Sequence, residues 1–322
     1  MKAVKFSVAA AAALALSTAA LADGPVVYGK QNVEVGSFDS GPTVGGETMG
    51  AKTQSSRFGI KGSHDLGDGL TGLYQIEIQH NLLGGIAEDD VDDGKNVGFG
   101  ARNSFLGVSG DFGTFIAGNH DHPSKLALYQ SGAGVFAADT TAKLVQAEFR
   151  SSPAAAYVGK AGGMSFAAAV VFDGKDSTPA EDLMHIDVAA WGAAGDIKYG
   201  VGVIIPDAEN VDPIMQASVG MNMDALNVGA SVQMGDESLG ANADMNIILQ
   251  ANMKLDGGMY AGVGAELFMA DAATEEDKTD IGLIVGKKYA EGKFDVYLAV
   301  KNGDSVVANG GTDVAVGLTA SF

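Results

Sequence analysis

The chain has 322 residues, with 40 acidic and 20 basic side chains, 46 glycines and no cysteine. The lack of cysteine excludes a disulfide framework, and the formal net charge of −20 argues against a nucleic-acid partner. Hydrophobic residues make up 46% of the chain, which is too many for a glycine-rich disordered protein but fits glycine-rich β-structure with many turns.

Residues 1–22 have the pattern of a secretory signal peptide. Lys2 and Lys5 precede an apolar stretch (Phe6–Leu16), and small residues end in Ala20-Leu21-Ala22. The apolar part is too short for the alternative interpretation, a membrane anchor. We therefore predict export with cleavage after Ala22. Cleavage removes two basic residues from a chain of net charge −20, so the mature charge becomes −22.

In the mature chain, 23–322, apolar and polar residues alternate in short runs, and this pattern is typical of β-strands with one buried face. In the first run, for example, Val33 and Val35 share one face while Lys30, Asn32 and Glu34 share the other. We count sixteen such runs, which in chain order are VVYGKQNVEV, RFGIKGSHDL, LYQIEIQH, ARNSFLGVSG, FIAGN, EFRSSPAAAYVG, SFAAAVVF, HIDVAAWG, IKYGVGVII, IMQASVGMNM, LNVGASVQM, ADMNIILQANMKL, MYAGVGAELFM, DIGLIVGKKY, FDVYLAV and TDVAVGLTASF.

The connections between these runs alternate between two kinds. One kind is a tight turn, such as Gly67-Asp68-Gly69, and the other is longer and acidic, such as GGIAEDDVDDGKN. Short turns at one end and long loops at the other are typical of an outer-membrane barrel, whose closure removes the strand edges that lipid cannot satisfy. The sequence thus predicts an all-β fold, a transmembrane antiparallel β-barrel of 16 strands with short periplasmic turns and longer extracellular loops. The last strand should pair with the first, which places Phe322 at the membrane interface.

Two stretches carry a family resemblance: SRFGIKGSHDLGDGLTGLYQIEIQ (Ser56–Gln79) and ARNSFLGVSGDFGTFIAGNHDHPSK (Ala101–Lys125). Together they resemble the general, non-specific porins of Gram-negative outer membranes. Phe322 resembles the C-terminal signal that the outer-membrane insertion machinery recognises in that family. The resemblance implies a homotrimer whose protomers are passive channels for ions and small hydrophilic solutes.

In this family the third extracellular loop folds inward and narrows the pore. Here that loop would run from about Asp121 to Gln146, and HPSKLALY within it predicts a short helix with Pro123 at its first position. The family also places a basic wall on the strands that face this acidic loop.

The chain has only three arginines: Arg57, Arg102 and Arg150. Alternation puts Phe58 and Ile60 toward lipid, hence Arg57 and Lys61 toward the lumen, where a cation avoids the cost of facing lipid.

The same alternation puts Arg102 on the face opposite Phe105, and Arg150 on the face opposite Phe149. Arg57 and Arg102 match the family motif for the basic wall. The role of Arg150 rests on alternation alone.

The candidate acids of the constriction loop are Asp121, Asp139 and Glu148, with solvation of the loop or capping of its helix as the alternative interpretation. Where the family often has arginine, this chain has Asn119, so the basic wall is thinner. Together with the mature charge of −22, this predicts a weak preference for cations.

No cofactor, metal ion or catalytic activity is expected. His120-x-His122 lacks a third ligand, EDDVDDGKN lacks the EF-hand spacing, and no Ser/His/Asp arrangement is detectable. The acidic stretch is still a candidate for attracting divalent cations that bridge lipopolysaccharide phosphates, with plain solvation as the alternative.

Other functions are a substrate-selective channel, a barrel adhesin or an outer-membrane enzyme. No lumenal aromatic cluster indicates a sugar path, and the external loops are short for an adhesin. A general diffusion porin in the outer membrane of a Gram-negative bacterium is therefore the prediction.

Overall fold

The computed structural model describes residues 24–39, 47–80, 83, 99–133, 135–137, 139–145, 150–172, 184–207, 211–235, 245–269, 277–304 and 311–322. The predicted signal peptide (1–22) lies outside the described residues, as do Glu148, Gln146 and the stretch EDDVDDGKN. What the sequence predicts for these segments stays a prediction.

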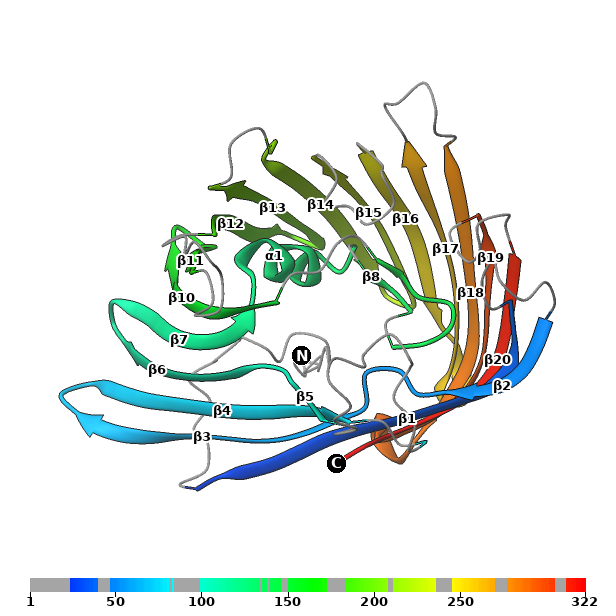
Figure 1. Ribbon diagram of the computed structural model, residues 1–322, viewed down its shortest axis with the longest axis horizontal. Helices are drawn as coiled ribbons and strands as arrows, with labels where there is room; N and C mark the ends of the chain where they lie inside the picture. Colours follow the sequence, from blue (N-terminus) through cyan, green and yellow to red (C-terminus); the bar gives the residue numbers. More distant parts are fainter. Residues whose placement is uncertain are drawn as a thin grey trace, which may run out of the picture.

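Most of the described residues form one antiparallel sheet that closes on itself, because β1 pairs with β20 on one side and with β3 on the other (Figure 1). The strands of this sheet are β1 (Val26–Asp39), β2 (Glu47–Lys52), β3 (Arg57–Gly67), β4 (Leu70–His80), β5 (Phe99–Ala101), β6 (Ser104–Gly110), β7 (Gly113–Asp121), β10 (Arg150–Ala161), β11 (Met164–Val171), β12 (His185–Ala194), β13 (Ile197–Pro206), β14 (Ile214–Met223), β15 (Leu226–Met234), β16 (Met245–Lys254), β17 (Met259–Met269), β18 (Lys278–Tyr289), β19 (Phe294–Gly303) and β20 (Gly311–Ser321).

Two barrel strands are interrupted. β2 and β3 follow one another along β1, and β5 and β6 follow one another along β4. With each pair taken as one strand, the described residues form a closed antiparallel barrel of 16 strands, as the alternation predicted.

The remaining elements are small. The helix α1 (Pro123–Ser131) is followed by a two-stranded sheet of β8 (Val135–Phe136) and β9 (Leu144–Val145), and the turns η2 (Asp256–Gly258) and η3 (Ala290–Gly292) join barrel strands. Among the described residues, no helix is long and apolar enough to cross a membrane.

Side chains alternate between the two faces of the barrel wall. On β18, Ile281, Leu283 and Val285 are exposed, whereas Asp280, Gly282 and Ile284, which alternate with them, are buried. The same alternation of exposed apolar residues with buried ones holds on β20. An outer face of this kind suits lipid, since it presents apolar side chains and a backbone fully paired within the sheet.

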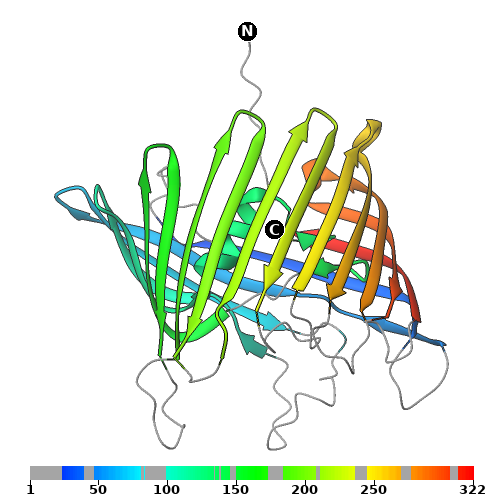
Figure 2. The ribbon, with the colours of Figure 1, turned by 90° about the horizontal axis from the view of Figure 1, so that it is seen from above.

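Tight turns join the strands at one end of the barrel, where Figure 2 shows the hairpins of β10–β11, β12–β13 and β14–β15. In the turn between β3 and β4, Asp68 and Gly69 both have positive φ angles, 51° and 77°. Two such residues match the right-handed twist of the flanking strands, so the Asp-Gly sequence accounts for this hairpin.

The prediction that Arg102 and Phe105 lie on opposite faces of the barrel wall is wrong. Ile78 pairs with Ala101 of β5, but Gln75 pairs with Phe105 of β6, so the register shifts by one residue at the interruption between them. A one-residue shift exchanges the two faces of a strand. Phe105 is therefore buried on the inner side, and its neighbour Leu106 is 70% exposed.

Candidate functional site

Residues 121–145, of which the structure describes 121–133, 135–137 and 139–145, are called the lumen segment here. Figure 1 shows α1 of this segment inside the ring of strands. The helix begins at Pro123, as predicted, and packs against β12, β13 and β14. A Cβ atom at Gly202 of β13 would lie 2.6 Å from the Ser124 Cβ atom, so the close approach of the helix requires glycine there.

The second half of the lumen segment reaches the opposite part of the wall. Its buried side chains form one apolar cluster with residues of β16, β18 and β19; the members are Phe136, Ala142, Leu144, Ile248, Ile284, Tyr297 and Ala299. The segment therefore crosses the inside of the barrel from β12–β14 to β16–β19, and both of its halves are held by packing.

Two buried carboxylates hold the lumen segment by the same arrangement. Asp187 of β12 accepts hydrogen bonds from the Ser124 backbone N–H at 3.1 Å and from the Ser124 hydroxyl at 2.7 Å. Glu34 of β1 accepts them from the Thr141 N–H at 2.7 Å and the Thr141 hydroxyl at 2.6 Å. Hydrogen bonds to an ionised acceptor are among the stronger ones, so these two contacts fix both ends of the segment.

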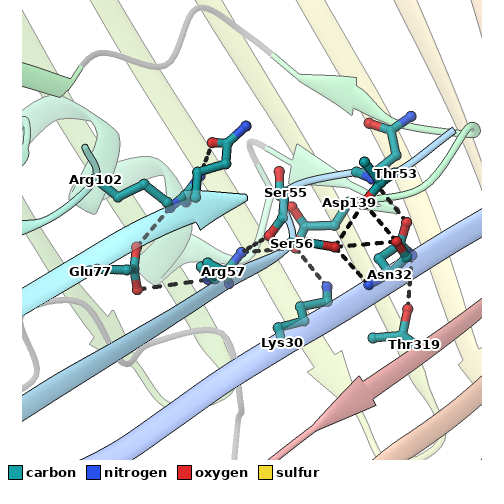
Figure 3. Close-up of polar contacts among 12 residues, drawn as sticks. Lys30, Asn32, Thr53, Ser55, Ser56, Arg57, Glu77, Arg102, Asp139 and Thr319 are labelled. Carbon is teal, nitrogen blue, oxygen red and sulfur yellow. Dashed lines mark hydrogen bonds and ion pairs between the residues drawn. The ribbon is translucent and has the colours of Figure 1, made fainter. Parts of the chain in front are cut away.

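Between these two contacts, Asp139 of the lumen segment meets two cations of the wall, Lys30 and Arg57. Together with the neighbouring wall pair of Glu77 and Arg102, these residues are called the charged ring here: Lys30, Arg57, Glu77, Arg102 and Asp139. Asp139 lies 2.7 Å from the Lys30 Nζ atom and 3.7 Å from Arg57 Nη1. Glu77 lies 2.7 Å from Arg102 Nε and 3.8 Å from Arg57 Nε. Figure 3 shows Arg57 between the two carboxylates.

The Asp139 carboxyl is held in its charged form. Burial by itself would raise the pKa of Asp139, but the Lys30 ammonium and the Arg57 guanidinium outweigh it and lower the pKa to about 2. The backbone of Asp139 has a φ of 62°, a conformation that aspartate tolerates better than most residues.

The residues in the break between β2 and β3 help to position Arg57. There the ladder along β1 is replaced by side chains: the Ser56 hydroxyl accepts a hydrogen bond from the Asn32 N–H at 2.9 Å, and the Thr53 hydroxyl donates to the Asn32 carbonyl at 2.8 Å. These bonds satisfy the buried backbone groups of Asn32. The Ser55 carbonyl is then free to accept a bond from Arg57 Nη1 at 3.0 Å (Figure 3).

The other predicted site residues lie apart from the charged ring or cannot be placed. Asp121 is buried, pairs with Lys125 at 2.8 Å and accepts a hydrogen bond from Asn103 at 3.0 Å. Lys61 lies with its Nζ atom 5.2 Å from the centre of the Tyr28 ring. Arg150 begins β10 opposite Asp121, and its side chain is outside the described part, like the whole of Glu148.

Two members of the charged ring were not predicted as site residues, Lys30 and Glu77. Alternation along the first strand already placed Lys30 on the inner face. Glu77 lies two residues after Gln75 in the stretch LYQIEIQ, so alternation places these two side chains on the same, inner face. The alternation indicates that Lys30 and Glu77 face inward, but it does not indicate which charged side chains they contact.

Comparison with known proteins decides the family. The model of the Gram-negative porin family matches residues 8–322. The chain belongs to this family. It is accordingly an outer-membrane protein.

Among curated relatives of this porin, the major outer membrane protein P.IB of Neisseria gonorrhoeae is 33% identical over 128 residues. The match covers 38% of this chain and 34% of the relative. Major outer membrane protein P.IA of Neisseria meningitidis serogroup B is 43% identical over 63 residues, which are 20% of this chain and 14% of the relative. The match therefore spans about a third or less of the length of these relatives.

Solved structures match over nearly the whole porin. An anion-selective porin from Comamonas acidovorans has a TM-score of 0.69 at 17% identity, covering 93% of this chain and 99% of that one. OmpT of Vibrio cholerae, in its trimer form, has a TM-score of 0.63 at 15% identity with the same coverage. At such identities the likeness shows the fold.

Proposed function

We propose that this porin is a passive diffusion channel for ions and small hydrophilic solutes across the outer membrane, and that it works as a homotrimer. The observation that carries the proposal is the charged ring. A closed barrel holds a segment across its interior, and the segment presents Asp139 to cations from β1 and β3. No step of chemistry is needed, because a solute passes through the water beside these groups by diffusion.

The lumen segment sets the width of the channel in this proposal. It is fixed to the wall at Ser124 and Thr141 and packed at both halves, so the passage is narrowed by a rigid element. Solutes that fit pass at a rate that depends on size and on the transverse field between opposite charges. In a narrow lumen, salt screens this field less than it does in bulk solvent.

We propose further that the channel weakly prefers cations. Each wall cation of the charged ring has a carboxylate beside it: Lys30 has Asp139, Arg102 has Glu77, and Arg57 lies between the two. The positive wall is therefore largely offset at short range. The strongly acidic composition then sets the longer-range field, and this field concentrates cations near the entrance.

Planar-bilayer recordings across a salt gradient test the proposal. The unaltered porin should show stable conductance with a reversal potential of cation-preferring sign. Arg57→Glu should move it further in that direction, and Lys160→Glu is the matched control, since exposed Lys160 lies beside the tight turn at Gly162. A reversal potential of anion-preferring sign would overturn the cation preference, and no conductance would overturn the channel.

The proposed partners follow from the family. We propose that three copies assemble in the membrane, that the insertion machinery recognises Phe322, and that lipopolysaccharide surrounds the outer rim. Cross-linking of the membrane-inserted protein, followed by mass determination, checks the trimer; monomers alone would contradict it.

A further inference from the structure

Two histidines meet at the start of the lumen segment, outside the charged ring. His122 directly precedes α1, and His185 is the first residue of β12. Their ring centres are 4.8 Å apart, and their Nε2 atoms face each other at 3.4 Å. His122 is fully buried, whereas His185 is partly exposed, so the pair has access to solvent from one side.

The distance between the two nitrogens fits an ion better than a hydrogen bond. A hydrogen bond between such groups has a typical length of about 2.7–3.2 Å. Two nitrogens that each lie about 2.0–2.1 Å from one tetrahedral metal ion are about 3.3–3.4 Å apart. The observed 3.4 Å is therefore the separation of two imidazole ligands of a single ion.

A carboxylate stands where it would orient the first ligand. Oδ2 of Asp187 lies 3.3 Å from Nδ1 of His122, close enough for an electrostatic contact but without the geometry of a hydrogen bond, and Asp187 is itself held by the N–H and hydroxyl of Ser124. A carboxylate beside Nδ1 favours the tautomer with its proton on that nitrogen, which leaves the lone pair of Nε2 directed at the partner. Histidine ligands of metal ions have such a carboxylate or carbonyl partner in most sites.

We propose that His122 and His185 form a binding site for one late first-row divalent ion, which has water at its remaining positions. Among the residues that the structure describes, no group of three or more His, Cys, Asp or Glu side chains is placed to hold a metal ion, so this part of the chain supplies two ligands. Imidazole suits copper, nickel and zinc, and Cu²⁺ binds most tightly of these. The ion joins the start of the lumen segment to the wall at β12.

The experiment titrates CuCl₂ into the detergent-solubilised mature porin, purified without a histidine tag, and counts ions by calorimetry and by electron paramagnetic resonance. We expect one Cu²⁺ per protomer with hyperfine splitting from two nitrogens, and weaker binding of NiCl₂ and ZnCl₂. His122→Ala and His185→Ala should each weaken copper binding by about tenfold or more, since either change removes half of the protein ligands.

His64→Ala is the matched control, because His64 stacks on Tyr74 near the tight turn of β3 and β4. Copper binding should survive it, and should also survive His120→Ala. Heat-modifiable migration in gels verifies the barrel in every variant. If an alanine variant fails to fold, His122→Asn or His185→Gln replaces it. No bound copper, binding unchanged in both pair variants, or loss in His64→Ala or His120→Ala overturns the site.

Discussion

The Asp139 carboxylate lies 2.7 Å from the Lys30 ammonium, although 109 residues separate them in the chain. Lys30 comes from the first barrel strand and Asp139 from the lumen segment, so this contact joins the wall to the element that crosses the interior. The same carboxylate lies 3.7 Å from Arg57. Removal of one charge at Asp139 should therefore alter two wall cations at once.

Asp139→Asn should shift the ion selectivity toward anions. With the carboxylate gone, Lys30 and Arg57 keep their charges, and the wall becomes more positive. For an ion that passes about 6 Å away in water, one unit charge contributes about 0.7 kcal/mol, with opposite sign for cations and anions, so the cation-to-anion permeability ratio should change by roughly tenfold. Reversal potentials in a KCl gradient measure this ratio. A shift toward cations would contradict the proposed ring, and Asp196→Asn, at a tight turn, is the control.

The effect of Asp139 should persist into strongly acidic solution. Its pKa is lowered to about 2, below the value near 3.9 of an unfolded aspartate. The ion pairs of Asp139 therefore stabilise the folded arrangement fully above about pH 4, and this contribution is lost as the pH falls toward about 2. The difference in reversal potential between the unaltered porin and Asp139→Asn should stay constant from neutral pH to about pH 4. A difference that disappears near pH 6 would show that the carboxyl is not held by these cations.

Thr141→Val should loosen one end of the lumen segment. The change deletes the hydroxyl that donates to Glu34 at 2.6 Å and retains the backbone bond at 2.7 Å. A hydrogen bond to a charged group contributes about 1.5–3 kcal/mol, so detached states of the segment should become roughly 10–100-fold more populated. Single-channel recordings should then show more current noise and more brief closures.

Two variants make the Thr141 test specific. Thr71→Val, in β4 and away from the lumen segment, should leave the noise unchanged. Ser124→Ala should act like Thr141→Val, because it deletes the matching hydroxyl bond to Asp187 at the other end of the segment. If current noise and brief closures do not increase in either Thr141→Val or Ser124→Ala, packing alone holds the segment.

Removal of Phe322 should reduce assembly rather than conduction. Its backbone exchanges two hydrogen bonds with Gly29, at 3.0 and 3.1 Å, where β20 closes on β1. Its ring lies over Gly29, whose missing side chain leaves the space. Without Phe322, the fraction of heat-modifiable barrel in the outer membrane should fall, while the conductance of surviving channels stays the same.

Phe322→Tyr keeps both an aromatic ring and the backbone bonds, so it should assemble nearly normally. Equal membrane levels of the deletion variant and the unaltered porin would rule out a role of Phe322 in assembly.

The amino-acid sequence by itself determined the strands and the direction in which most of their side chains point. The period of two is a local property: Arg57 is inward because Phe58 beside it is outward, and no distant residue is needed to know this. Short turns such as Asp68-Gly69 likewise follow from the conformations that these residues tolerate. The helix start at Pro123 was predictable for the same reason.

Only the tertiary structure decided which charges meet. Closure of the barrel and the path of the lumen segment bring Asp139 to Lys30, and His122 to His185, and both contacts depend on chain segments far apart in sequence. The register shift before Phe105 depends on how β5 and β6 pair with β4, so local alternation predicted the wrong face. A periodic pattern specifies a face but not a partner, because the register and the packing that select the partner are properties of the whole barrel.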